Sequence, residues 1–147
     1  MKILSLLFLS LFLGRGCSDN QKQDINTAVI EYVAGSRGFY QKIMIEKQMV
    51  RISSGRAGKE KIVPMNISDS NWKELLSFFT TIKLDSLAKL KAPTEKRLYD
   101  GAAIASLKII YKDKAYETRA FDHGFPPKEI EQLVNKITSF AKQDNEN

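Results

Sequence analysis

The pattern of apolar and polar positions changes at Ala28, and short runs rich in β-branched and aromatic residues follow, which are typical of β-strands. Residues 27–33 and 39–46 are rich in β-branched and aromatic types and flank the segment AGSRG, a pattern that predicts a β-hairpin. A third strand is expected at residues 49–53 after the Lys47-Gln48 turn. A weaker fourth is expected at residues 61–65, where Pro64 limits the pairing.

After residue 68 the apolar residues recur every three to four positions. The residues at i, i+3, i+4 and i+7 are Trp72, Leu75, Leu76 and Phe79. This spacing predicts an α-helix with one apolar stripe. Ser68 or Ser70 can cap its start, and we expect it to end near Ile82.

The rest of the chain predicts a loop, a second hairpin and a final helix. Residues 84–97 contain leucines but also Pro93 and scattered lysines, so we interpret them as a loop with a short helical turn and no packed element. Residues 103–111 and 115–121 flank Lys112-Asp113-Lys114, which predicts a second β-hairpin. Pro126 and Pro127 can open the last helix, because the first turn tolerates their missing N–H groups. Its apolar face would consist of Ile130, Leu133, Val134, Ile137, Phe140 and Ala141.

This order of elements predicts the α+β class. We expect an antiparallel β-sheet of two hairpin units with two helices packed on one face, in the order β-strands–α–ββ–α. The chain has 147 residues, of which 43% are hydrophobic and 27% charged, the profile of one globular domain with short appendages. We assign residues 27–147 to this single domain.

The first sixteen residues have a different character. Lys2 is followed by an apolar run at residues 3–13 that only two serines interrupt, which is the layout of a secretory signal peptide. As a helix this run would be about 16 Å long, whereas the hydrocarbon core of a bilayer is about 30 Å thick. A permanent transmembrane span is therefore not expected, and we assign residues 1–16 to an export signal.

Cys17 is the only cysteine of the chain and directly follows this segment, with Gly16 before it. The segment thereby resembles a bacterial lipoprotein signal peptide, although Gly14 and Arg15 stand where that family prefers Leu and a small residue. The resemblance implies that Cys17 becomes the first mature residue and carries a diacylglycerol thioether, usually with a further fatty acid such as palmitate on its amine. The alternative is an ordinary cleaved signal that leaves a free or buried thiol.

The residue after the cysteine bears on the destination. An Asp there would resemble the inner-membrane retention signal of some bacteria, but this chain has Ser18. The resemblance therefore implies an outer-membrane lipid anchor, with the domain facing the periplasm or the cell surface. Residues 18–26 are polar, so we interpret residues 17–26 as the lipidated cysteine and a flexible tether.

Composition restricts the chemistry further. The formal charge is +6, and it falls to +4 when residues 1–16 are removed. One Cys and one His leave almost no material for metal clusters or disulfides, so we expect no metal and no cofactor. The basic residues are interleaved with acidic ones and do not alternate with aromatic residues, which argues against nucleic acid as a partner.

Charge and glycine coincide in three segments at the ends of predicted strands. If the sheet brings them together, these residues could form a polar pocket for a small or peptidic ligand: Arg37, Arg97, Asp100, Asp122 and His123. The alternative is structural, because Asp-Gly pairs make turns and Arg-Asp pairs hold loops together. Trp72 is expected in the core rather than in a ligand site.

His123 is also the one side chain suited to general base catalysis near neutral pH. A small hydrolase could use it with Asp100 or Asp122, but a relay needs a carboxylate aimed at the ring and a nucleophile within reach. Asp122 is its neighbour in the chain and is badly placed for that. Our expectation is that the protein is not an enzyme.

Three short sequence motifs do not identify a function. Residues 55–60, GRAGKE, lack the glycine spacing and the Ser or Thr of a phosphate-binding loop. Asp85-Ser86-Leu87 resembles the O-glycosylation motif of exported Bacteroidetes proteins, which makes Ser86 a possible acceptor. Asn66-Ile67-Ser68 fits the N-glycosylation sequon, but we interpret it as the approach to a helix cap.

The strings GSRGFY, LYDGAA and FDHGFPPKEI give residues 28–141 a resemblance to small lipoproteins of Bacteroidetes. That resemblance implies no activity and transfers no catalytic residue. We expect a lipid-anchored envelope protein that binds an envelope protein or a small ligand, or that serves as an accessory subunit or inhibitor. The rival hypotheses are the small hydrolase and a purely structural envelope component.

Overall fold

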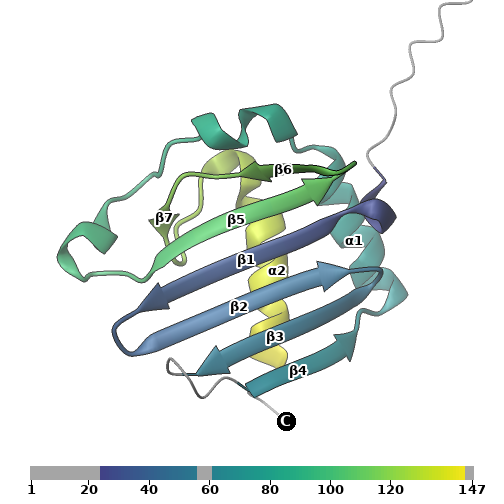
Figure 1. Ribbon diagram of the computed structural model, residues 1–147, viewed down its shortest axis with the longest axis horizontal. Coiled ribbons are helices and arrows are strands. Elements are labelled where there is room, and N and C mark those ends of the chain that lie inside the picture. The colour runs from purple at the N-terminus through teal and green to yellow at the C-terminus, as the bar shows by residue number, and fades with distance from the viewer. Residues whose placement is uncertain (1–23, 56–60, 145–147) are drawn as a thin grey trace, which may run out of the picture.

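One antiparallel sheet and two α-helices form the two layers of the computed structural model, which describes residues 24–55 and 61–144 (Figure 1). The strands are β1 (Val29–Ser36), β2 (Phe39–Glu46), β3 (Met49–Gly55), β4 (Lys61–Asn66), β5 (Ile104–Tyr111), β6 (Lys114–Glu117) and β7 (Phe121–Asp122). The helices are α1 (Asp69–Thr80) and α2 (Glu131–Asp144), and the 3-10 turns are η1 (Ile25–Thr27), η2 (Leu84–Lys89), η3 (Lys96–Tyr99) and η4 (Lys128–Ile130).

Strands that follow one another in the chain are neighbours in the sheet within two groups, β1 to β4 and β5 to β6. The sheet reads β4-β3-β2-β1-β5-β6, and β7 also pairs with β5. Because β5 pairs with β1, the two hairpin units join side by side into one sheet. The turns at Lys47-Gln48 and Lys112-Asp113 have positive φ at both residues, the backbone that matches the twist of two-residue hairpins.

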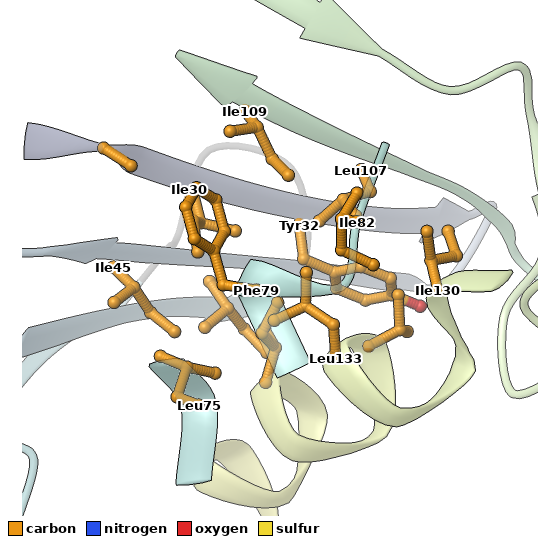
Figure 2. Close-up of a cluster of buried hydrophobic side chains, with 14 of the residues drawn as sticks. Ile30, Tyr32, Ile45, Leu75, Phe79, Ile82, Leu107, Ile109, Ile130 and Leu133 are labelled. Atoms are coloured by element: carbon orange, nitrogen blue, oxygen red, sulfur yellow. The ribbon is translucent and has the colours of Figure 1, made fainter. Parts of the chain in front are cut away.

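Both helices cover the same face of the sheet (Figure 1). Alternate residues of β1, β3, β5 and the second half of β2 point toward the helices and are buried, as the two-residue period of a β-strand requires. Figure 2 shows these side chains meeting Leu75 and Phe79 of α1 and Leu133 of α2 in one apolar layer. The described residues thus share one continuous core.

The α+β class and the order of strands and helices are confirmed. Ser68 caps α1, and the whole predicted apolar face of the last helix, residues 130–141, is buried. Within the described residues, none of the helices is both long and apolar enough to cross a bilayer.

Three details differ from the sequence-based expectation. Residues 84–97 do contain packed elements, because Leu84, Leu87 and Leu90 are buried. The strand expected at 115–121 is divided into β6 and β7. The fold also includes residues 24–26 of the expected tether, since Ile25 is buried in the core.

Candidate functional site

Asp122 is the buried centre of a loop cluster at one end of the sheet. It lies in β7, has 0% of its surface exposed, and accepts four hydrogen bonds. Its donors are the Thr94 hydroxyl at 2.5 Å, the backbone N–H of Lys96 at 2.7 Å, and the backbone N–H and guanidinium of Arg97 at 3.0 and 3.1 Å. The carboxylate therefore joins β7 to the segment that contains η3.

The hydrogen bonds to Asp122 decide its charge. Burial alone would raise the pKa of this carboxyl, but the donors from Thr94, Arg97 and Lys96 outweigh burial and lower the pKa to about 2. Arg97 also donates to the carbonyl of Thr94 at 2.8 Å, so its guanidinium is fixed on both sides. Asp122 is thus a charged structural anchor.

His123 follows Asp122 and is held by a different partner. Its Nδ1 lies 2.7 Å from the hydroxyl of Tyr32 on β1, and its backbone N–H donates to the carbonyl of Ala103. Its ring also lies 5.3 Å from the ring of Phe39, the first residue of β2. Gly124 then turns the chain with a φ of 87°, a conformation that favours glycine. The imidazole is therefore fixed in position between β1 and β2.

The register of the strands explains the space around these rings. Ala34 pairs with Gln41 on one side and with Ala105 on the other, and Ala105 pairs with Phe121. Two alanines in this row leave room on the helix-facing side of the sheet for larger neighbours. Tyr32 fills part of it, with its ring 6.3 Å from that of Phe121.

A hollow of about 250 Å³ remains beside His123. The β1–β2 end of the sheet, the turn after β7 and α2 supply its lining: Phe39, Gln41, His123, Gly124, Val134, Asn135, Thr138, Ala141 and Lys142. Sites for drug-sized ligands are usually about 300–1,000 Å³, so this hollow suits a smaller ligand.

The electrostatics of the hollow keep its histidine neutral. Burial, and then the nearby cation of Lys142, lower the pKa of His123 below its ordinary value. Burial raises the pKa of Tyr32, so its phenol stays protonated. With Nδ1 engaged by Tyr32, Nε2 is the ring atom left for a ligand. No hydrogen bond to Nε2 is found in the described parts of the chain.

The five residues expected to form a pocket are brought together only in part. Arg97 and Asp122 form an ion pair, as the structural alternative for these residues states, and His123 lines the hollow. Arg37 is exposed in the β1–β2 turn and Asp100 is exposed with a φ of 59° at the end of η3, and neither lines the hollow.

The same geometry bears on the hydrolase hypothesis. The carboxylate of Asp122 is occupied by η3 and Thr94, and the partner of Nδ1 in His123 is a phenol. Within the described residues, no contact joins Asp100 to His123, and no three side chains of the His, Cys, Asp and Glu types are grouped to hold a metal ion. Among the residues that the structure describes, His123 is therefore not part of a carboxylate–histidine relay.

Several lining residues escape sequence reasoning. Gln41 and Asn135 line the hollow and Tyr32 holds His123, but all three belong to elements whose other residues build the core, and only the folded arrangement brings them to this place. The available signal was a polar Gln41 on the buried face of β2, where alternation predicts an apolar residue.

The remaining expected positions lie elsewhere. Cys17 and most of the segment 55–60 lie outside the described residues. Ser86 is half-buried in η2, and its hydroxyl donates to the carbonyl of Lys83 at 2.7 Å. Its glycosylation stays a prediction.

No protein-family model, curated protein or solved structure matches this chain at a significant level.

Proposed function

We propose that this chain is a lipid-anchored protein of the cell envelope that acts as a binding or accessory module, and that it takes a small polar or peptidic ligand in the hollow beside His123. The observation that carries the binding proposal is the fixed imidazole, held by Tyr32 at one end of the sheet and open toward a hollow of about 250 Å³. The anchor rests on the position of Cys17 after an export signal.

The lining of the hollow supports an anionic or acceptor-rich ligand. Gln41, Asn135 and Thr138 offer side-chain hydrogen bonds, Lys142 offers a cation, and the ring of Phe39 offers an apolar surface. A peptide with a free terminal carboxylate combines the groups that such a lining recognises. The ligand would approach between the β1–β2 hairpin and α2.

Short peptides test the binding site. Because His123 is the only histidine, its ring signals in an NMR spectrum report on the hollow without ambiguity. Di- and tripeptides with a free carboxylate should shift these signals, and their C-terminal amides should bind about tenfold more weakly, since a charged hydrogen bond is lost. Lys142→Gln should weaken the acids alone, whereas the control Lys128→Gln should change nothing. Signals that no peptide acid moves would refute a peptide ligand.

Crosslinking in cells tests the role of the hollow in its own compartment. A photoreactive phenylalanine analogue at position 39 should capture a ligand or partner that the same analogue at Tyr99 does not capture. Tyr99 is exposed but lies outside the lining of the hollow. Identical products from the two positions would refute a specific site beside His123.

The lipid anchor has a separate test. Cells fed an alkyne fatty acid should label the wild-type protein and leave Cys17→Ala unlabelled, and only the wild type should sediment with the outer membrane. Equal labelling of the two forms would rule out lipidation of this cysteine. The result does not depend on whether the hollow binds a ligand.

A further inference from the structure

A second and larger hollow of about 560 Å³ lies between η2 and the β5–β6 hairpin. Its lining residues are Lys83, Leu84, Asp85, Ser86, Lys89, Tyr111, Lys112 and Tyr116. We call it the lysine hollow. It does not include any residue of the hollow beside His123.

Charge in the lysine hollow is mainly positive. Its lining has three lysines, Lys83, Lys89 and Lys112, all exposed, and one carboxylate, that of Asp85. This carboxylate already pairs with the ammonium of Lys114 at 3.2 Å. The rim therefore presents an excess of cations around a concave surface, which favours anions.

The base of the lysine hollow is aromatic and apolar. Tyr111 and Tyr116 line it together with the buried Leu84, and the ammonium groups of Lys112 and Lys114 lie 5.3 and 4.7 Å from the centres of these two rings. Tyr111 is itself buried, whereas Tyr116 is partly exposed. A partly exposed tyrosine is typical of surfaces at the level of lipid headgroups, where the ring meets apolar material and the hydroxyl meets water.

The lysine hollow also lies where the described fold begins. The backbone N–H of Asp24 donates to the hydroxyl of Tyr111, at 3.2 Å. Cys17 is seven residues before Asp24, and seven extended residues span at most about 25 Å. A lipid on Cys17 would therefore keep this side of the domain close to the membrane surface.

We propose that the lysine hollow binds the phosphate headgroups of anionic phospholipids in the membrane that holds the anchor, and so fixes the orientation of the domain on that membrane. The inference rests on the lipid anchor proposed above. In this orientation the β5–β6 hairpin and η2 face the bilayer, while the β1–β2 turn at the other end of the sheet, and with it the hollow beside His123, face away (Figure 1). The ligand site stays accessible to a partner.

The expected strength follows from the number of cations. Each lysine close to an anionic membrane surface strengthens binding by about fivefold, and the attraction fades over about 8–10 Å at physiological salt. Three lysines cannot hold a protein on a membrane alone. They can orient a domain whose lipid already keeps it there.

The single cysteine allows the anchor to be rebuilt chemically. A chain of residues 17–147, coupled through Cys17 to a maleimide lipid, would be held on vesicles of phosphatidylcholine or of equal parts phosphatidylcholine and phosphatidylglycerol. The rate at which each lysine is acetylated then reports which side faces the bilayer. Lys83, Lys89 and Lys112 should react about three- to fivefold more slowly on the anionic vesicles, and high salt should remove the difference.

Lysines on other surfaces provide the control. Lys73 on α1 and Lys128 on η4 are exposed and should react equally on both vesicles. The proposal would be overturned if the three lysines of the hollow react at the same rate on both kinds of vesicle. It would also be overturned if Lys73 and Lys128 are slowed on the anionic vesicles as much as these three. Inorganic phosphate added to the phosphatidylcholine vesicles tests whether the hollow binds free phosphate instead of a phospholipid headgroup. If it protects the three lysines as well as phosphatidylglycerol does, the hollow is a site for a free anion and the membrane assignment is wrong.

A matched pair of variants gives a second measurement. At low salt, where the attraction is least screened, the uncoupled chain with Lys83→Gln, Lys89→Gln and Lys112→Gln should have a partition coefficient for phosphatidylglycerol vesicles at least about tenfold lower than that of the wild-type chain. Arg37→Gln, Lys73→Gln and Lys128→Gln remove the same charge elsewhere and should have little effect, so equal losses would overturn the proposal. Neither vesicle measurement requires lipidation in the cell. If the fatty-acid labelling fails, the lipid anchor is refuted, but the vesicle measurements still test whether the lysine hollow binds anionic lipid.

Discussion

The hydroxyl of Tyr32 and Nδ1 of His123 lie 2.7 Å apart, although 91 residues separate them in the chain. Tyr32 belongs to the buried face of β1, and His123 follows the short strand β7. The two meet because β5 pairs with both β1 and β7. One hydrogen bond thus joins the core of the sheet to the turn that borders the hollow.

Removing this hydroxyl should release the imidazole without disturbing the core. Tyr32→Phe keeps the ring and loses one hydrogen bond, so we expect the free energy of unfolding to fall by about 1 kcal/mol. Nitrogen NMR should find one tautomer of His123 in the wild type and a mixture in the variant. A variant with the same single tautomer would show that Tyr32 does not fix the ring.

The protonation of His123 should depend on Lys142. Burial and this cation lower the pKa of His123, so the folded state binds its proton less readily than the unfolded state. Stability should therefore be fully present above the ordinary pKa of 6.5 and decrease as the pH falls below it toward the lowered value. Lys142→Gln should raise the pKa in an NMR titration, and Lys128→Gln should leave it unchanged. A pKa unchanged by Lys142→Gln would exclude this electrostatic contribution.

Asp122 gives a dependence of the same sign at lower pH. Its pKa is lowered from 3.8 to about 2, so its contribution to stability is present above pH 3.8 and is lost as the pH falls toward 2. Urea unfolding across this range should show a steeper loss for the wild type than for Asp122→Asn, which has no proton to gain. Parallel curves would mean that other carboxyls cause the acid sensitivity.

Removing the Asp122 carboxylate altogether should be costly. Asp122→Ala leaves the guanidinium of Arg97 and two backbone N–H groups without their acceptor, so we expect a loss of about 3–5 kcal/mol. Thr94→Val removes only one of the four donors and should cost less. Urea unfolding of both variants checks this order. Equal losses would indicate that the hydrogen bond from Thr94 carries the whole effect.

The sheet and both helices could be predicted because their sequence signals extend over many residues. The runs of β-branched and aromatic residues in β1 and β2, and the helical stripe from Trp72 to Phe79, are long enough to identify each element. The site was not readable in the same way. His123 and Asp122 stood out by type, but their partners Tyr32 and Thr94 come from distant segments, and a single sequence contains no register.

Residues 84–97 escaped prediction for another reason. Their 3-10 turns are too short to show a period, and Pro93 with the surrounding lysines suggests a loop. Two leucines allow the packing of these turns to be tested, since Leu87 in η2 is 1% exposed and Leu98 in η3 is 70% exposed. Leu87→Ala should lower the free energy of unfolding by about 2–5 kcal/mol, whereas Leu98→Ala should change it by about 0.5 kcal/mol or less. Similar losses in urea unfolding would contradict the packing of η2.

The break between β6 and β7 depends on Thr118. Its backbone N–H donates to the carbonyl of Leu107 at 2.9 Å, and its hydroxyl accepts from the N–H of Leu107 at 3.0 Å. The side chain thus completes the pairing at a point where the strand leaves the ladder.

Thr118→Val keeps the shape and leaves the buried N–H of Leu107 without an acceptor, which should lower the free energy of unfolding by about 1–3 kcal/mol. Thr118→Ser keeps the acceptor and should cost less, because it loses only a methyl group. Hydrogen exchange at Leu107 should accelerate in Thr118→Val and stay slow in Thr118→Ser; if exchange is equally slow in both variants, the hydroxyl does not protect this amide.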